Sequence, residues 1–105
     1  MTAEQTFERV VATLGGEPGV TLGKAFHNPG LKLGTKLFAM LHPDGLVVKL
    51  PEGRCRDLLA SGAAKTFDRG QGTPMREWVT LDPPDTRRWT SYAQEALSFG
   101  RELAA

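Results

Sequence analysis

The sequence predicts a single α+β domain, spanning residues 1–105, in which an antiparallel sheet packs against helices in the order α-β-β-β-α-β-β-α. Three observations favour this class. The chain of 105 residues is long enough for one hydrophobic core and too short for two. Segments near both ends space apolar residues as a helix does. Between them, alternating or strand-forming segments are separated by turns rich in Gly and Pro.

The first helix is predicted over residues 3–14. Thr2 is placed to cap its first turn, and Gly15 and Gly16 are placed to end it. Its apolar residues fall at i, i+3, i+4 and i+7 and form one stripe, consisting of Phe7, Val10, Val11 and Leu14.

Three strands are expected before the second helix. The first covers residues 20–27 and is followed by a turn at 28–30. The second is a single long strand over 31–41, in which Gly34 marks a bulge or a close backbone approach. The sequence His-Pro-Asp-Gly at 42–45 then predicts a tight turn, so that residues 46–50 return as the partner strand of a hairpin.

The remaining elements follow from helix and strand signals. Pro51 suits the first position of a helix that runs to Ser61 and ends at Gly62. Two strands, at 63–67 and 75–81, flank a loop at 68–74. Asp85 is placed to cap a final helix, whose stripe consists of Trp89, Ala93, Ala96, Gly100 and Leu103.

Composition limits the class of protein. The longest apolar runs are strand-sized, so no transmembrane helix is expected. The acidic, amphipathic N-terminus does not resemble a signal peptide. Cys55 is the only cysteine, which excludes an internal disulfide and favours a reducing, cytoplasmic location. The net charge is +1, but residues 20–65 hold seven basic side chains against three acidic ones, a mild indication of an anionic partner.

No catalytic, cofactor-binding or metal-binding residues are predicted. The segments 19–25 and 30–36 lack the spacing of a phosphate-binding loop. His27, His42 and Cys55 show no paired-ligand spacing, and a small enzyme that uses them is the least favoured interpretation. Cys55 lies three and four residues before Leu58 and Leu59, so we expect it to be buried and inert.

Three lysines are the candidate contact residues for nucleic acid or another partner. Lys32 and Lys36 share the parity of the predicted long strand, so both are expected on one sheet face. Lys49, on the next strand, joins them if the register permits. Three cations predict weak binding with little sequence preference. The alternative is that these lysines keep an exposed strand face in water and discourage edge pairing.

The chain resembles the TfoX N-terminal domain family and, more loosely, MmcQ/YjbR-like proteins. The resemblance rests on the order of "GVTLGKAF", "KLFAM", "VVKLP" before a helix ending in Gly, "REWV" and "YAQEAL", and covers residues 5–103. It implies a secretion-chaperone-like fold without enzyme activity. TfoX-type regulators carry a further C-terminal domain, whereas this chain ends at Ala105. Whether another chain supplies that domain is left open.

The sequence therefore predicts a small cytoplasmic, non-enzymatic regulatory module that acts by protein–protein contact, through the sheet surface or the edge of the second helix. No cofactor or membrane contact is expected. The partner is unknown, and both a monomer and a homodimer are open. The alternative is a DNA-binding protein of YjbR-like type that uses a lysine-bearing sheet face. DNA binding has been suggested for those relatives from fold similarity, which is an analogy and not evidence from a site.

Overall fold

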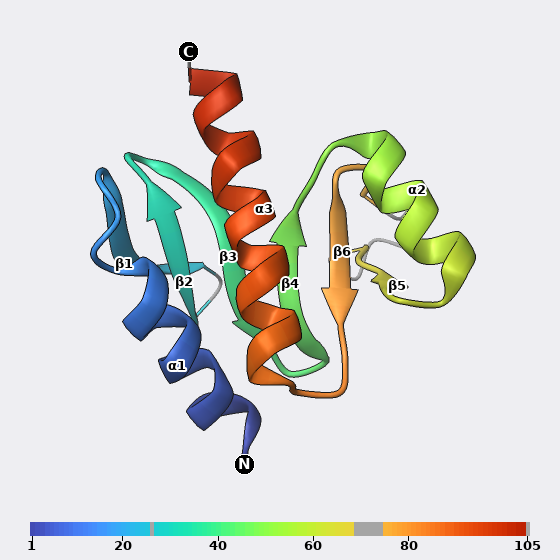
Figure 1. The fold of residues 1–105 in the computed structure, drawn as a ribbon, viewed down its shortest axis with the longest axis horizontal. Coiled ribbons are helices and arrows are strands. Elements are labelled where there is room, and N and C mark those ends of the chain that lie inside the picture. The colour runs from blue at the N-terminus through green and yellow to red at the C-terminus, as the bar shows by residue number, and fades with distance from the viewer. Residues whose placement is uncertain (26, 69–74, 105) are drawn as a thin grey trace.

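The structure, a computed structural model, describes residues 1–25, 27–68 and 75–104. These form one α+β domain with a six-stranded antiparallel sheet, whose strand order is β1-β2-β3-β4-β6-β5 (Figure 1). The predicted class is confirmed, with one strand more than expected. The elements are α1 (Ala3–Leu14), β1 (Val20–Ala25), β2 (Asn28–Leu33), β3 (Lys36–His42), β4 (Gly45–Lys49), α2 (Glu52–Ser61), β5 (Lys65–Thr66), β6 (Trp78–Leu81) and α3 (Thr86–Ala104).

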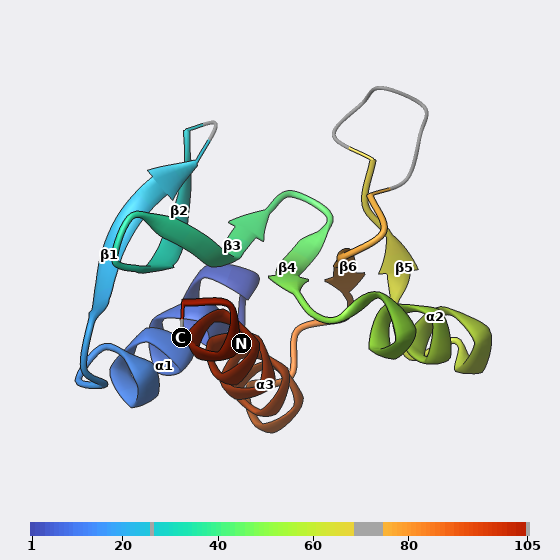
Figure 2. The same cartoon turned by 90° about the horizontal axis from the view of Figure 1, so that it is seen from above.

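The helices lie on one side of the sheet. Figure 2 shows α3 under the centre of the sheet, α1 beside α3 toward the β1 end, and α2 under the end formed by β6 and β5. Within the described ranges no helix covers the opposite side, which we call the open face. The sheet is therefore a two-layer structure with one face packed and one face available for other contacts.

The predicted helix ends are confirmed except for the start of the second helix. The Thr2 hydroxyl accepts the N–H of Gln5, while the Gln5 side chain accepts the N–H of Thr2, which together make a capping box. Gly62 ends α2 with a φ of 78°, a left-handed conformation that glycine adopts without strain. The carboxylate of Asp85 accepts the N–H of Arg88 at 2.8 Å and caps α3. Pro51 precedes α2 as its cap instead of opening it.

The single strand predicted over 31–41 is wrong. The chain turns at Gly34 and Thr35, so β2 and β3 are separate antiparallel strands. Gly34 has a φ of 62°, which suits a tight turn and not a strand interior. The alternation of apolar and polar residues continues across this turn, which is why the two strands looked like one.

The turn predicted at 28–30 is also wrong. These residues belong to β2, because Asn28 pairs with Ala25 and Pro29 pairs with Lys24. The reversal comes earlier, where His27 adopts a φ of 68°. Residue 26, at the end of the predicted first strand, lies outside the described residues.

The hairpin predicted at 36–50 is confirmed. His42 pairs with Gly45 across a two-residue turn of Pro43 and Asp44. Gly45 has a φ of 142°, and a Cβ at this position would lie 2.2 Å from the carbonyl oxygen of Leu81 on the neighbouring chain segment. Gly45 thus permits both the turn and the close approach of β6.

A β-bulge at Phe38 divides the side chains of β3 between the two faces. Leu31 pairs with Ala39 and Lys32 pairs with Leu37, so Phe38 is the extra residue. As a result Phe38 is buried in the main core beneath the helices, while Leu37 packs in a smaller cluster on the open face. That cluster comprises Met40, Val47 and Phe67, with Leu37, Met75 and Trp78 packed against them.

The last two strands are shorter than predicted. The expected strand at 63–67 is reduced to Lys65–Thr66, and the one at 75–81 is reduced to Trp78–Leu81. Of the loop predicted at 68–74, residues 69–74 lie outside the described residues. The chain on either side is joined by a hydrogen bond from the N–H of Met75 to the carbonyl of Phe67, 2.8 Å long.

Candidate functional site

The three candidate lysines do not share one face. Lys32 pairs with Leu37, whose side chain lies in the open-face cluster, and directly paired residues project to the same side of a sheet. Lys36 pairs with Leu33, which packs against the main core, so Lys36 belongs to the helix side. The predicted common face for Lys32 and Lys36 is therefore wrong, because the chain reverses at Gly34 and Thr35 and pairs Lys36 with Leu33 instead of continuing the strand.

Lys49 remains with Lys32 on the open face. Lys49 and Val47 are two residues apart on β4, so their side chains project to the same face, and Val47 is buried in the open-face cluster. Lys49 also pairs with Trp78 of β6. Trp78 is half-buried and belongs to the same cluster. Of the three candidate lysines, Lys32 and Lys49 thus lie on the open face, near the apolar side chains of Leu37 and Trp78.

The residues considered for an enzyme lie on separate elements. His27 is an exposed residue of the β1–β2 turn. His42 ends β3, where its Nδ1 accepts the N–H of Asp44 at 3.1 Å and its ring meets Phe67 edge-on at 5.4 Å. Cys55 is only 2% exposed, within α2. His27, His42 and Cys55 therefore lie at separate places in the fold, and no described contact joins them.

Cys55 is buried as predicted. Its thiol donates to the carbonyl of Leu50 at 3.5 Å. Burial raises the pKa of the thiol. A thiol with a raised pKa is a weak nucleophile at neutral pH. Among the described side chains, no group of three or more His, Cys, Asp and Glu is arranged to hold a metal ion.

A groove runs beside α2 at the β5 end of the sheet, and we call it the α2-edge groove. Its volume is about 330 Å³. Cys55 and Leu59 of α2 and Met75 contribute apolar atoms, and Thr66 brings the outer strand β5 into the lining. The lining is completed by Glu52, Arg56 and Arg76.

The charges around this groove are arranged around one carboxylate. Glu52 lies 3.6 Å from a guanidinium nitrogen of Arg56 and 3.8 Å from one of Arg76. Both arginine side chains are highly exposed, at 73% and 85%. Two cations share one anion, so the lining carries an excess of positive charge beside an apolar surface.

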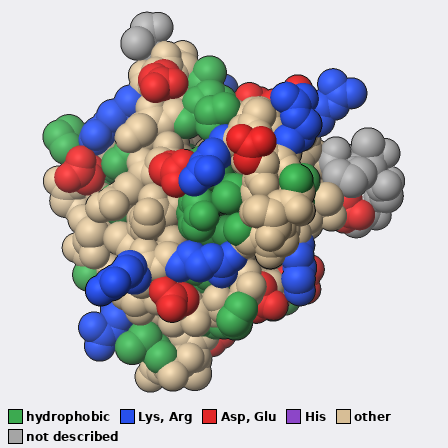
Figure 3. Space-filling model, turned by 45° about the vertical axis from the view of Figure 1, so that its right-hand side comes forward, with side chains coloured by type: hydrophobic (Ala, Val, Ile, Leu, Met, Phe, Trp, Pro, Cys, Tyr) green, Lys and Arg blue, Asp and Glu red, His purple; other side chains and the backbone are tan. Residues whose placement is uncertain are grey.

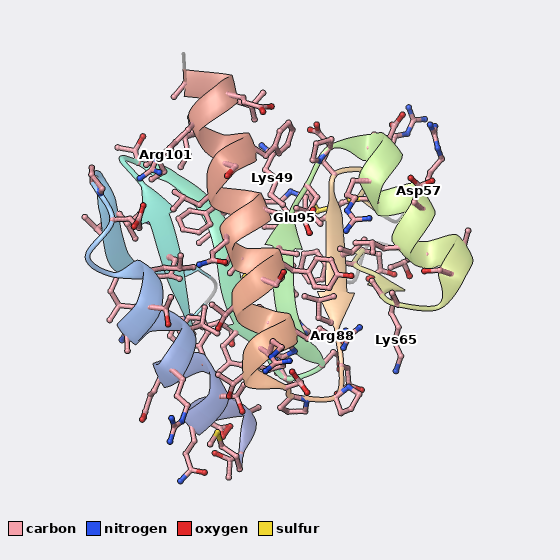
Figure 4. All side chains as sticks on the ribbon, viewed as in Figure 1. Lys49, Asp57, Lys65, Arg88, Glu95 and Arg101 are labelled. Atoms are coloured by element: carbon pink, nitrogen blue, oxygen red, sulfur yellow. The ribbon has the colours of Figure 1, made fainter. Side chains whose placement is uncertain are left out.

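Two arginine contacts fix α2 against α3. Arg54 donates two hydrogen bonds to the carboxylate of Glu95, at 2.9 and 3.2 Å, and its guanidinium lies 5.6 Å from the ring centre of Tyr92. At the other end, Arg88 donates to the carbonyl of Ala63. Figure 4 shows Glu95 and Arg88 on the side of α3 that faces α2. Figure 3 shows hydrophobic side chains exposed between these two helices, with charged side chains on either side.

Sequence reasoning named the edge of the second helix but not the groove residues. Arg56 and Leu59 lie on α2, whereas Met75 and Arg76 come after the loop predicted at 68–74. They meet because β5 pairs with the end of β6. The strands at 63–67 and 75–81 were predicted from the sequence, but their pairing was not, and this meeting depends on the pairing.

No helix in the described part of the chain is long and apolar enough to cross a membrane. Comparison with protein-family models, curated proteins and solved structures finds no match for the chain. The resemblance to the TfoX N-terminal domain therefore stays a prediction.

Proposed function

We propose that this protein is a non-enzymatic binding module that acts by protein–protein contact, with the α2-edge groove as its docking site. The observation that carries the proposal is the combination of apolar side chains from Cys55, Leu59 and Met75 with exposed arginines at one groove. Interfaces typically combine an apolar centre with a polar rim in which arginine is enriched. The resemblance to a regulatory domain family supports the same reading, and the single reduced cysteine supports a cytoplasmic location.

The groove is also the most suitable of the described hollows for such a contact. A hollow beside the β3–β4 turn is lined by Pro43 and by polar or charged side chains, without any large hydrophobic residue. Another, along the outer side of α1, has Met1 and Ala12 among polar and charged residues. The hollow beside the β3–β4 turn also borders the outer strand β5, through Lys65 and Thr66, but only the α2-edge groove combines that strand with an apolar lining.

The test uses the immobilised chain to capture partners from a lysate of its source cells. The groove variant is Arg56→Glu with Arg76→Glu, and the matched control is Arg9→Glu with Arg87→Glu, which makes the same charge change at exposed positions of α1 and α3. We expect the unmodified chain and the control to retain the same proteins and the groove variant to lose them. Retention should survive nuclease treatment.

A third variant, Leu59→Ala, removes part of the apolar lining without changing any charge. Its capture should also fall, because the apolar contact is smaller. Equal capture by the unmodified chain, the groove variant and Leu59→Ala would contradict the proposal.

Nucleic-acid binding is the second candidate. It is favoured by one observation, the placement of Lys32, Lys49 and the half-buried Trp78 on the open face. Single-stranded nucleic acids are bound by cations that contact phosphates together with aromatic rings that stack on bases. Two lysines give only a small electrostatic contribution, so this candidate ranks below the first.

A further inference from the structure

We infer that the α2-edge groove takes an acidic peptide segment, in which an Asp or Glu lies next to a large aliphatic side chain. The inference rests on the proposed function and specifies the chemistry of the partner. The groove has two parts, the exposed arginine pair at Glu52 and the apolar surface of Cys55, Leu59 and Met75. A ligand that uses both parts needs a negative group and an apolar group a few ångströms apart.

The arginine pair is suited to a second carboxylate. Arg56 and Arg76 contact Glu52 at 3.6 and 3.8 Å, longer than the 2.7–2.9 Å typical of charge-assisted hydrogen bonds. Each planar guanidinium has five N–H donors, and the contacts with Glu52 described for Arg56 and Arg76 use few of them, which leaves capacity for another anion among the described residues. A cationic ligand would be repelled by two arginines and attracted by one carboxylate, and is therefore disfavoured.

The place of the groove favours a peptide over a small molecule. Thr66 of β5 lines the groove, and β5 is the outer strand of the sheet, paired with β6 on one side. The exposed edge of a strand offers backbone donors and acceptors to an extended chain. A volume of about 330 Å³ is at the small end of small-molecule pockets but is sufficient for two neighbouring side chains.

The experiment is a selection from a phage-displayed library of random seven-residue peptides on the unmodified chain. We expect enriched peptides to carry Asp or Glu next to Leu, Ile, Met or Phe. Synthetic copies should bind the Arg56→Glu, Arg76→Glu variant at least about fivefold more weakly, and the Arg9→Glu, Arg87→Glu control with unchanged affinity. Selection on the groove variant should instead enrich Lys and Arg, because its charge is reversed.

The outcomes separate the inference from the proposed function. Enriched peptides that lack acidic residues but still bind Leu59→Ala more weakly would overturn the acidic specificity and leave the groove as a docking site. Enriched peptides whose affinity is unaffected by any groove variant, or no enrichment at all, would overturn both. All three variants are checked by circular dichroism and urea unfolding, so that loss of binding is not confused with loss of fold.

Discussion

At the scale of single residues, two glycines in similar turns have different structural roles. Gly45 and Gly34 both have positive φ, at 142° and 62°. A Cβ on Gly45 would meet the Leu81 carbonyl oxygen at 2.2 Å, whereas a Cβ on Gly34 would have nothing within 4 Å among the described atoms. Gly45 is therefore constrained by backbone angle and space together, and Gly34 by angle alone.

This contrast makes a prediction about stability. Gly45→Ala should lower the free energy of unfolding by about 3 kcal/mol, because β6 must move away from β4. Gly34→Ala should lower it by only about 1 kcal/mol, the cost of a left-handed conformation. Urea unfolding of both variants measures the difference. A loss at Gly45 no greater than that at Gly34 would show that β4 and β6 adjust easily.

Cys55 supports a prediction about reactivity and pH. Burial raises the pKa of its thiol, so the folded protein should react with a disulfide reagent on the order of 10³-fold more slowly than the unfolded chain. The neutral thiol is favoured in the folded state, so its contribution to stability is complete below the ordinary thiol pKa. That contribution is lost as pH rises through the folded-state pKa.

The measurement compares the unmodified chain with Cys55→Ala. Stability of the unmodified chain should fall more steeply than that of the variant as pH rises above about 8.5. Parallel pH profiles for the two proteins, or rapid labelling in the native state, would mean that the thiol is accessible.

At the scale of elements, α1 depends on its first turn as well as on its buried face. The capping box of Thr2 and Gln5 satisfies two backbone N–H groups that a helix start leaves without partners. Thr2→Ala should lower the free energy of unfolding by about 1 kcal/mol. Thr13→Ala is the matched control, because the one hydrogen bond described for that hydroxyl is to the carbonyl of Arg9 within the helix. It should change stability by a few tenths of a kcal/mol or less.

The outcome is read from urea unfolding of both variants, followed by the circular dichroism signal of the helices. Equal effects at the two positions would show that the capping box contributes nothing beyond helix propensity.

The elements also show what the sequence can predict. Caps, helix stripes and the turn at 42–45 depend on neighbouring residues, so Thr2, Gly62 and the hairpin were found from local chemistry. The separation of β2 from β3 was missed because Lys32 and Lys36 keep period-two alternation across the Gly34 turn. The bulge at Phe38 was also missed, since it depends on the paired strand.

At the scale of the whole molecule, the candidate sites depend on which face each strand presents. The α2-edge groove is lined by residues of α2, of β5 and of the chain just before β6. These residues are far apart in the sequence, so no local pattern marks the groove. The prediction that Lys32 and Lys36 share one face was wrong for a related reason. The turn at Gly34 and Thr35 pairs Lys36 with Leu33 and so places Lys36 on the helix side, and a small change in register transfers side chains between faces.

The division of the lysines between the two faces of the sheet provides an internal control for the nucleic-acid hypothesis. Lys32 and Lys49 lie on the open face, whereas Lys36 lies on the helix side. Lys24 also belongs to the helix side. It lies four residues after Val20 on β1, so the two side chains project to the same face, and Val20 is part of the main core. The double variants Lys32→Glu, Lys49→Glu and Lys24→Glu, Lys36→Glu therefore have equal net charge and differ in the face they alter.

If the open face binds nucleic acid, only the Lys32→Glu, Lys49→Glu variant should lose affinity for labelled single-stranded DNA at low salt. Two phosphate contacts predict a slope of about −1.5 for log affinity against log salt in the unmodified protein. Trp78→Phe should weaken binding further without changing that slope, because stacking does not release counterions. Equal losses in both double variants would indicate attraction by net charge alone. No binding by the unmodified protein would exclude the open face as a nucleic-acid site, while the α2-edge groove would be unaffected, because none of the residues changed here lines it.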